Sequence, residues 1–235
     1  MAATRLPGKP LLKINNLSII SHVFKRAEEA NIGEVVVATE DQEILEDVIK
    51  NGGKAILTNK NHKTGTDRIF EAYEKLNIKN IDYILNLQGD EPNIDKVDII
   101  NLNNFMINQD AELGTLAAKI QDDNMLNNRN IVKVITDKKL VENNFPIALN
   151  FTREDLLIDS QNIYHHIGIY SYKTSVLEKF VSLGQTNNEK KNKLEQLRAL
   201  DNKLKINVAL AKSSPIGVDT EEDYLAIKKI MEYKL

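Results

Sequence analysis

The chain has 235 residues, of which 42% are hydrophobic and 28% are charged, and its mean hydropathy of -0.36 is ordinary for a globular domain. Its 31 basic and 34 acidic side chains give a formal net charge of -3, so no global positive field attracts nucleic acid or an anionic membrane. Because cysteine is absent, the sequence excludes a disulfide scaffold, a thiolate nucleophile and a cysteine-ligated metal.

From residue 17 to about residue 119, short apolar runs alternate with amphipathic stretches whose apolar side chains recur at helical spacing. The predicted helices are residues 17–30, 42–51, 66–76 and 95–108. The predicted strands are residues 34–39, 54–57, 82–87 and 113–119. Asp41 is placed to cap the second helix, and Gly52 to end it. This alternation is typical of βαβ units and predicts an α/β fold with a mostly parallel sheet.

The pattern changes after about residue 120, where strand-like segments follow one another with little helix between them. Strands are predicted within residues 131–150, 163–172 and 205–211. Helices are predicted at residues 174–183, 192–200 and 220–233, and exposed loops at residues 121–130 and 185–193. The sequence therefore predicts a single domain over residues 1–235, with a β-rich excursion at about residues 120–172.

Two aspartates follow predicted strands. Asp90 lies in NLQGDEP (86–92), at the carboxyl end of a predicted buried strand, which is the edge where ligands bind in open α/β sheets. A carboxylate there can hold Mg²⁺ together with substrate phosphates, although a plain strand-to-turn element is the alternative. Asp219 precedes the last helix, so Asp219 or Thr220 can simply be its N-cap. Asp219 becomes a candidate ligand only as a partner of Asp90.

The segment TRLPGKP (4–10) is compact and basic. Gly8 permits close approach of a ligand to the backbone, and Arg5 and Lys9 can neutralise phosphate oxygens. A solvated chain terminus is the alternative. Only six of the 31 basic residues are arginine, so each arginine is a candidate for a contact that needs a planar, bidentate guanidinium.

Three further motifs each have a structural and a functional interpretation. HKTGTDR (62–68) offers hydroxyl groups and a glycine at a helix start with Arg68 one turn in, or else a helix cap with a surface arginine. His166 lies in the strand-like IYHHIGIYSY, on the same face as Tyr170, although a histidine in a strand is usually structural. EQLR (195–198) is helical, and a solvated charged face is the usual meaning of such a sequence.

In combination, these motifs resemble the CMP-Kdo synthetases, which are 3-deoxy-manno-octulosonate cytidylyltransferases. The resemblance runs from Ala3 to the final helix and rests on several motifs in family order. They are TRLPGKP (4–10), VVVATED (35–41), HKTGTDR (62–68), NLQGDEP (86–92), HIGIYSYK (166–173), LEQLRAL (194–200) and GVDTEED (217–223). The resemblance implies a Rossmann-like, GT-A-like nucleotidyltransferase fold and a homodimer formed through the β-rich excursion. It also implies the reaction CTP + Kdo → CMP-Kdo + pyrophosphate, for lipopolysaccharide biosynthesis.

The resemblance further implies roles for individual residues. Lys9, Asp90 and Asp219 are the expected catalytic residues, and the two aspartates are the expected ligands of a Mg²⁺ cofactor. The expected nucleotide-binding residues are Arg5, Lys9, Thr64, Gly65, Arg68 and Gln88. The expected sugar-binding residues are Arg153, His166, Tyr170, Glu195, Gln196 and Arg198.

The chain departs from the family pattern in two places. Family members begin with a strand and a Pro-Ala-Arg-like turn whose arginine contacts phosphate, and this sequence starts after that turn. The family's Ser-Arg-x-x-Ile-Pro stretch appears here as TREDLL (152–157), without the proline. The alternatives are therefore a truncated, inactive relative, or a CMP-sugar synthetase for a related sugar acid. TRLPGKP argues against an acylneuraminate cytidylyltransferase.

The expected partners are CTP and Kdo, with neither nucleic acid nor a membrane among them. No apolar run approaches the ~20 residues of a membrane span, and the start lacks a basic region followed by an apolar one. The expected location is therefore the cytoplasm. We also expect that adding the upstream strand would raise both stability and CTP affinity.

Overall fold

The computed structural model describes residues 6–155, 162–212 and 214–232. The chain divides into two compact units. The first unit consists of Met1–Asn77, Leu87–Ile99 and Pro215–Leu235, and the second of Ile78–Asn86 and Ile100–Ser214. The second unit includes the segment that was expected to form a β-rich excursion. A single domain over the whole chain stays a prediction.

The first unit contains two short strand pairs, β1–β2 and β3–β4, together with every helix that the sequence predicts for it. Its elements are the 3₁₀ helix η1 (Lys9–Leu11), β1 (Lys13–Ile14), β2 (Leu17–Ser18), α1 (Ile19–Ala30), β3 (Val37–Thr39), α2 (Gln42–Lys50), β4 (Ala55–Leu57), α3 (Gly65–Leu76) and α9 (Glu221–Glu232). Strands β3 and β4 pair in parallel, and β1 and β2 form an antiparallel hairpin. The sequence prediction missed this hairpin. Its turn consists of Asn15 and Asn16, both with positive φ, and such a pair of residues is a known signal for a tight hairpin turn.

Polar side chains cap the helices of the first unit. Asp41 accepts a hydrogen bond from the Glu43 amide at 2.9 Å and so caps α2, as predicted. Two apolar clusters hold the helices in place. One consists of Ile14, Ile19, Val218 and Ile227, and the other of Ile20, Phe24 and Val48. The first cluster joins the start of the chain to its last helix, which are far apart in sequence.

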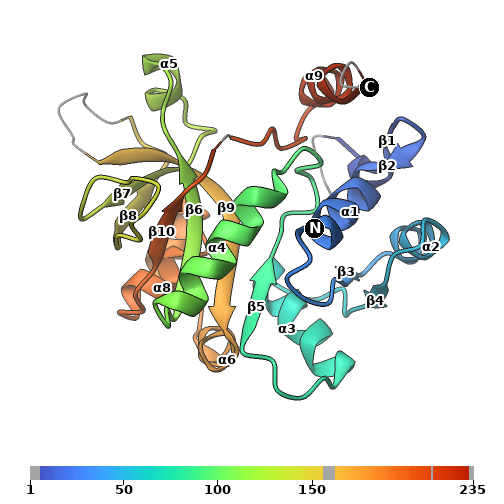
Figure 1. Cartoon of the computed structure of the whole chain (residues 1–235), viewed down its shortest axis with the longest axis horizontal. Coiled ribbons are helices and arrows are strands. Elements are labelled where there is room, and N and C mark those ends of the chain that lie inside the picture. The colour runs from blue at the N-terminus through green and yellow to red at the C-terminus, as the bar shows by residue number, and fades with distance from the viewer. Residues whose placement is uncertain (1–5, 156–161, 213, 233–235) are drawn as a thin grey trace. The chain divides into compact units, whose positions relative to one another are not determined.

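The second unit is built on one six-stranded sheet (Figure 1). Its elements are β5 (Tyr83–Asn86), β6 (Leu113–Ala118), α5 (Asp123–Leu126), β7 (Lys133–Thr136), β8 (Ala148–Thr152), β9 (Ile163–Lys173), α6 (Thr174–Ser182), α7 (Asn187–Asn192), α8 (Leu197–Asp201) and β10 (Asn207–Leu210). The strand order is β10-β6-β9-β7-β8, and β5 also pairs with β9. Helix α4 (Lys96–Asn108) begins in the first unit and ends in the second.

The predicted α/β class is confirmed, and among the described residues the six-stranded sheet is mixed, because β6–β10 is parallel whereas its other strand pairs are antiparallel. The parallel pairs are β3–β4 and β6–β10. Strand β9 is 11 residues long and pairs antiparallel with β5, β6 and β7, so the chain reverses direction where it runs back through this sheet. Helix α4 packs so closely on β6 that only a glycine fits at position 114. A Cβ atom at Gly114 on β6 would lie 2.5 Å from Met106 Sδ on α4.

The prediction of an exposed loop at residues 185–193 is wrong, because this segment contains helix α7. Thr186 and Glu189 form a reciprocal capping box that starts the helix. Lys193 ends it in the left-handed conformation, with φ of 53°. The helix predicted over residues 192–200 is accordingly reduced to α8, which begins only at Leu197.

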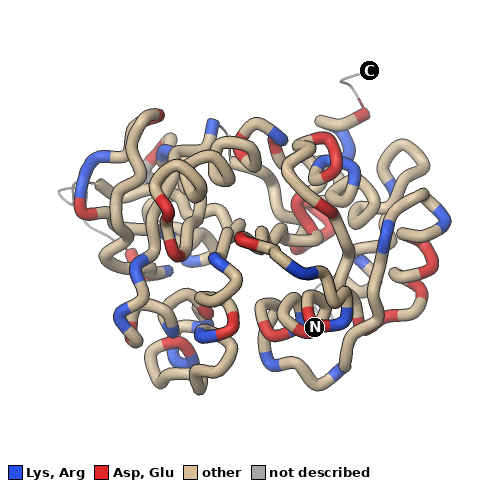
Figure 2. The backbone as a smooth tube through the Cα atoms, turned by 60° about the horizontal axis from the view of Figure 1, so that its bottom comes forward, with Lys and Arg blue, Asp and Glu red and all other residues tan. Residues whose placement is uncertain are grey.

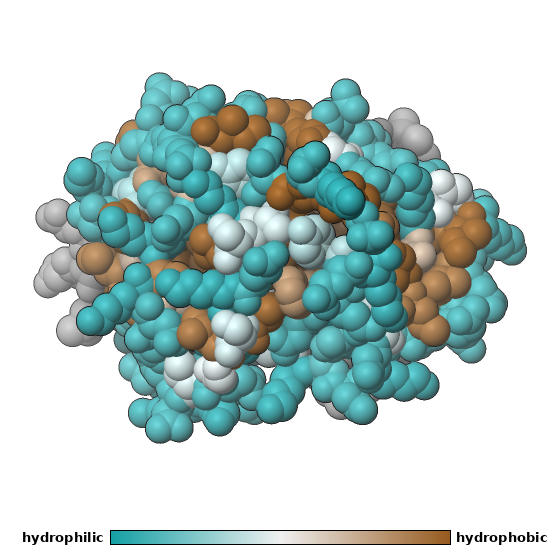
Figure 3. Space-filling view, turned by 90° about the horizontal axis from the view of Figure 1, so that it is seen from below, coloured by the Kyte–Doolittle hydropathy of each residue, from teal (hydrophilic) through white to brown (hydrophobic). Residues whose placement is uncertain are grey.

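The surface carries both signs of charge. Figure 2 shows basic and acidic residues interspersed along the backbone, in keeping with the near-balanced composition. On the face shown in Figure 3, hydrophilic residues predominate and apolar residues form separate groups. Within the described ranges, no helix is both long and apolar enough to cross a membrane.

Candidate active site

Lys9 lies at the start of η1, directly after a glycine that shapes the turn. Gly8 has φ of 69°, a left-handed conformation that side chains with a Cβ rarely adopt, and its carbonyl accepts a hydrogen bond from the Leu11 amide. Lys9 Nζ lies 2.6 Å from Asp90 Oδ2 and 3.1 Å from Asp219 Oδ1. One ammonium group therefore joins two carboxylates that are 129 positions apart in the chain, all within the first unit.

The backbone brings the two aspartates together. The Val218 amide donates to the Asp90 carbonyl at 2.9 Å, so the segment before α9 is hydrogen-bonded to the Asp90 turn. The Ile216 amide donates to Asn93 Oδ1 at 3.1 Å and makes a second connection between these segments. The Val218 side chain is fully buried in the first apolar cluster. Burial of the Val218 side chain thus holds the backbone next to Asp219 in place.

Thr220, rather than Asp219, caps the last helix. Thr220 Oγ1 accepts from the Asp223 amide at 3.2 Å, and Asp223 Oδ2 accepts in return from the Thr220 amide at 2.9 Å. The capping alternative is therefore confirmed for Thr220. It leaves the Asp219 carboxylate to contact Lys9.

Negative charge predominates at this site. Burial disfavours the charged form of Lys9, but the contacts with Asp90 and Asp219 outweigh it and raise the pKa of this lysine. Asp90 Oδ2 and Asp219 Oδ1 contact the same nitrogen, Lys9 Nζ, at 2.6 and 3.1 Å. The two carboxylates are therefore close to each other. Asp90 and Asp219 lie close enough to share one ligand, and their expected role as metal ligands stays a prediction.

The donor set fits a hard cation that also binds substrate oxygens. In the part of the chain that the structure describes, no group of three or more His, Asp or Glu side chains is arranged to hold a metal. Two carboxylates nevertheless match Mg²⁺, which usually takes one or two carboxylates and completes its shell with water and phosphate oxygens. Asp90 and Asp219 are thus suited to a metal that arrives with a nucleotide.

The residues expected to bind the nucleotide base lie in the same unit, mostly around the start of α3. Thr64 caps α3 by accepting from the Asp67 amide at 3.3 Å. Arg68 pairs with Glu40 and donates to Thr58 Oγ1 at 2.8 Å. Gly65 is the first residue of α3, and a Cβ atom there would meet nothing within 4 Å. The structural interpretation of this motif is confirmed for Thr64, and the expected nucleotide contacts stay a prediction.

The two other residues expected to bind the nucleotide are Gln88 and Arg5. Gln88 is exposed and lies two residues before Asp90. Arg5 lies outside the described residues.

An ion-pair network that sequence reasoning missed holds the loop before α3. Glu71, on α3, contacts His62, pairs with Lys75 Nζ at 2.7 Å and accepts from the Asn59 amide at 2.9 Å. Its hydrogen bonds with Lys75, His62 and Asn59 lower the pKa of Glu71 to about 2. The loop that leads to Thr64 is therefore attached to α3 by a fully ionised carboxylate.

His166 and Tyr170 lie in the second unit on β9, and both are buried. Their ring centroids are 5.5 Å apart, which confirms the shared face predicted from strand alternation. His166 Nε2 lies 3.0 Å from Thr115 Oγ1, and its ring meets Phe151 edge-on. Burial, followed by the nearby charges of His165 and Arg153, lowers the pKa of His166 to about 3, so this histidine is neutral at physiological pH.

Arg153 follows β8 and is tied to a neighbouring loop of the second unit. Arg153 Nη1 donates to the Asn130 carbonyl at 2.7 Å and to the Arg129 carbonyl at 3.3 Å. Next to it, the fully buried Lys133 donates to the Asn128 carbonyl at 2.9 Å, and burial lowers the pKa of Lys133. This side of the second unit therefore combines two cationic groups with backbone carbonyl partners.

The EQLR segment is not the solvated charged face that its composition suggested. Gln196 is 8% exposed and Arg198 is 2% exposed. Arg198 Nε and Nη2 donate to Glu189 Oε2 and Oε1 at 2.9 and 2.6 Å. Arg198 thus uses its guanidinium fork on a carboxylate of the protein, and the expected direct contact with a sugar acid stays a prediction.

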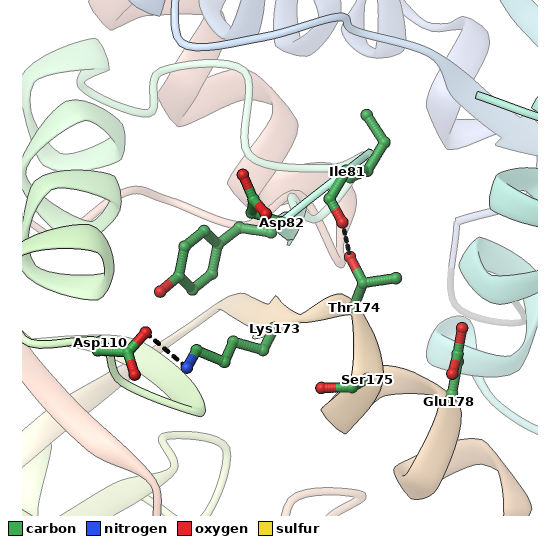
Figure 4. Close-up of a pocket in the computed structure, with 8 residues that line it drawn as sticks. Ile81, Asp82, Asp110, Lys173, Thr174, Ser175 and Glu178 are labelled. Atoms are coloured by element: carbon green, nitrogen blue, oxygen red, sulfur yellow. Dashed lines mark hydrogen bonds and ion pairs between the residues drawn. The ribbon is translucent and has the colours of Figure 1, made fainter. Parts of the chain in front are cut away.

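A cavity of about 490 Å³ lies elsewhere in the second unit, at the beginning of β5 (Figure 4). Its lining includes Tyr83 and Glu178, together with an ion pair of 2.6 Å between Lys173 Nζ and Asp110 Oδ1. None of the predicted site residues lines this cavity.

The comparison with protein families defines the class of the molecule. The model of the cytidylyltransferase family matches residues 1–206 of the chain. A solved structure of CMP:2-keto-3-deoxy-manno-octonic acid synthetase complexed with CTP superposes with a TM-score of 0.89 at 33% identity, over 99% of this chain and 95% of that chain. The protein is therefore a cytidylyltransferase, and the predicted nucleotidyltransferase fold is confirmed.

Comparison with individual relatives narrows the class. The 3-deoxy-manno-octulosonate cytidylyltransferase of Thermodesulfovibrio yellowstonii is 42% identical over 245 residues, which cover 97% of this chain and 94% of that protein. The enzyme of the same description from Rhodopseudomonas palustris is 42% identical over 234 residues, which cover 99% and 95%. The chain belongs to the 3-deoxy-manno-octulosonate cytidylyltransferase family.

Proposed function

We propose that this chain catalyses the reaction CTP + 3-deoxy-manno-octulosonate (Kdo) → CMP-Kdo + pyrophosphate, for lipopolysaccharide biosynthesis. The observation that carries the proposal is the convergence of Lys9, Asp90 and Asp219 at one point of the first unit. The relatives named for this reaction, and the related structure that holds CTP, support it.

The chemistry is a nucleotidyl transfer, in which the CMP group passes from CTP to the sugar and the enzyme forms no covalent bond to either substrate. The anomeric hydroxyl oxygen of the sugar attacks the α-phosphorus of CTP and forms a new P–O bond. The bond between the α-phosphorus and the bridging oxygen to the β-phosphate breaks, and pyrophosphate leaves with that electron pair. The hydroxyl proton passes to solvent. Catalysis therefore consists of positioning the two substrates and neutralising the charge of the triphosphate.

Asp90 and Asp219 are the residues that would hold Mg²⁺ in this proposal. Mg²⁺ held by these carboxylates would supply positive charge to the phosphate oxygens and would favour ionisation of the attacking hydroxyl group. Asp90 Oδ2 and Asp219 Oδ1 both face Lys9 Nζ, so one small cation can satisfy both carboxylates.

Lys9 has a second task in this proposal. Without nucleotide, its ammonium neutralises the two carboxylates at 2.6 and 3.1 Å. When the triphosphate binds, we infer that the Lys9 ammonium turns to the phosphate oxygens and leaves the carboxylates to the metal. The lysine thereby keeps the two aspartates close together before the substrate arrives, which lowers the reorganisation that binding requires.

The remaining expectations complete the proposal. Arg5, Thr64, Gly65, Arg68 and Gln88 bind CTP. The residues proposed for the sugar acid are Arg153, His166, Tyr170, Glu195 and Gln196, and Arg198 belongs to the same site. We further propose that the protein is a cytoplasmic homodimer that pairs through the β-rich segment at about residues 120–172.

The test is a pyrophosphate-release assay with purified protein, CTP and Mg²⁺, run separately with Kdo, with an amino-substituted octulosonic acid and with a nonulosonic acid. We expect Kdo to give the highest kcat/KM and one CMP-sugar per pyrophosphate. Faster turnover of another sugar acid would move the assignment to a related CMP-sugar synthetase. No release with any of the three sugars would contradict the proposal.

A further inference from the structure

We propose that Glu189 is a positioning residue for the sugar-acid site, because its bidentate ion pair with Arg198 fixes the turn that carries Glu195 and Gln196. This inference rests on the proposed function, which assigns Glu195 and Gln196 to the sugar. It adds a residue that lies nine positions before Arg198 and outside the motifs considered so far.

The geometry of the pair is that of a rigid clamp. Arg198 Nε lies 2.9 Å from Glu189 Oε2 and Arg198 Nη2 lies 2.6 Å from Glu189 Oε1, a parallel two-point contact. The exposed fractions of the two side chains are 2% for Arg198 and 4% for Glu189. Two charges that water does not screen hold each other in one orientation more firmly than a surface pair does.

Glu189 and Arg198 each make further contacts besides the ion pair between them. Glu189 also accepts from the Gln185 side-chain amide and from the Thr186 backbone amide, each at 3.2 Å. The Arg198 guanidinium carbon lies 4.7 Å from the ring centroid of Phe180 on α6. The carboxylate is thus anchored at the start of α7, and the guanidinium is stacked on a buried aromatic ring.

The clamp spans the turn between α7 and α8. The Leu194 amide donates to the Glu189 carbonyl at 3.3 Å, and the Arg198 amide donates to the Glu195 carbonyl at 3.0 Å. The Ala199 amide donates to the Gln196 carbonyl at 3.1 Å. The backbone of Glu195 and Gln196 is therefore bonded to the same short helices that the ion pair joins. Loss of the pair frees α7 from α8 and releases the turn between them.

This arrangement also gives Arg198 a role other than the one expected from the sequence. A guanidinium that is already engaged by a carboxylate and is 2% exposed is poorly placed to meet a second carboxylate from the substrate. Arg198 therefore acts through Glu195 and Gln196, and Glu189 is its necessary partner.

A double-mutant cycle distinguishes this role from the others. We would compare Glu189→Gln, Arg198→Gln and the double variant with the wild type, measuring KM for Kdo, KM for CTP, kcat and the thermal midpoint Tm. Lys191→Gln, an exposed charge change on α7, is the matched control. Assays run well below the lowest Tm, so that only folded protein contributes. Glu189→Leu combined with Arg198→Met supplies a folded, apolar replacement, should the polar variants be unstable.

We expect each single variant to raise KM for Kdo about tenfold or more, with KM for CTP within about twofold of the wild type, because the CTP residues belong to the other unit. The double variant should be no worse than the worse single variant, since either change already breaks the clamp. The apolar replacement should keep a high Tm and still raise KM for Kdo, because it lacks directional bonds. The Lys191→Gln control should match the wild type.

Four results would overturn the inference. If Arg198→Gln raises KM for Kdo while Glu189→Gln does not, the arginine binds the sugar directly. If the two effects add, the residues act independently. If Tm falls while KM for Kdo stays constant throughout, the pair is only structural. If the wild type itself makes no CMP-Kdo, the proposed function fails and this inference fails with it.

Discussion

Lys9 neutralises two carboxylates at once, and this arrangement decides how each of the three residues responds to substitution. The lysine side chain is 15% exposed, whereas the Asp219 side chain is 52% exposed. A half-exposed carboxylate contributes little to stability, because water solvates it almost as well as the ammonium does. Changes at Asp219 should therefore affect metal and nucleotide far more than folding.

Replacement of Lys9 by alanine tests its role toward phosphate. In Lys9→Ala, we expect kcat/KM for CTP to fall at least about tenfold, because a charge aimed at the triphosphate is lost. KM for Kdo should change little. Lys13→Ala is a suitable control, since Lys13 is exposed on β1. Steady-state kinetics with each substrate varied in turn provides the measurement, and wild-type kinetics in Lys9→Ala would refute the role.

Replacement of Asp219 by asparagine tests the proposed metal ligand. In Asp219→Asn, we expect the Mg²⁺ concentration for half-maximal activity to rise by at least about 10–100-fold, because the loss of even a residue that only supports a metal ligand costs that much. The Tm without nucleotide should stay close to that of the wild type. Glu221→Gln removes a nearby exposed charge on α9 and serves as the control. An unchanged Mg²⁺ requirement in Asp219→Asn would return this residue to a purely structural role.

Among the helices and strands, the sequence predicted those features that depend on the spacing of residues close together in the chain. The amphipathic patterns of α1, α2 and α3 and the cap at Asp41 were found because apolar periodicity and capping residues act over a few positions. Helix α7 was missed, because its six residues are all polar and it is stabilised by one buried carboxylate. The Thr186–Glu189 spacing is a capping-box signal that could have revealed it.

The loop before α3 offers a prediction about pH. Contacts with Lys75, His62 and Asn59 lower the pKa of Glu71 from 4.5 to about 2, so its stabilising contribution is complete above pH 4.5 and is lost as the pH falls toward 2. Glu71→Gln should therefore lower Tm by a few degrees at pH 7, and the difference should shrink below pH 4.5. Thermal unfolding of both proteins from pH 7 to pH 3 measures this.

The neighbouring Glu74 provides the control for that experiment, because it is exposed on the same helix. Glu74→Gln should leave Tm unchanged across the range. A Tm difference for Glu71→Gln that is constant or grows toward low pH would contradict the ionised network.

Contacts between residues that are far apart in the chain were predicted from the family resemblance and not from local sequence patterns. The meeting of Lys9 with Asp90 and Asp219 depends on contacts over 81 and 210 positions, and no periodicity encodes them. The Arg198–Glu189 pair was not foreseen for the same reason. A separation of nine residues matches neither helical nor strand spacing, so the choice of partner was settled by the packing of α7 against α8.

We propose that Lys9, Asp90 and Asp219 form the metal- and triphosphate-binding centre of this cytidylyltransferase. The most direct test is a crystal structure of the wild-type protein with Mg²⁺ and a non-hydrolysable CTP analogue. We predict a metal within about 2.1 Å of an oxygen from each aspartate, with Lys9 Nζ turned to a phosphate oxygen. A bound analogue with Lys9 still between the two carboxylates, and with no metal at either of them, would contradict this assignment.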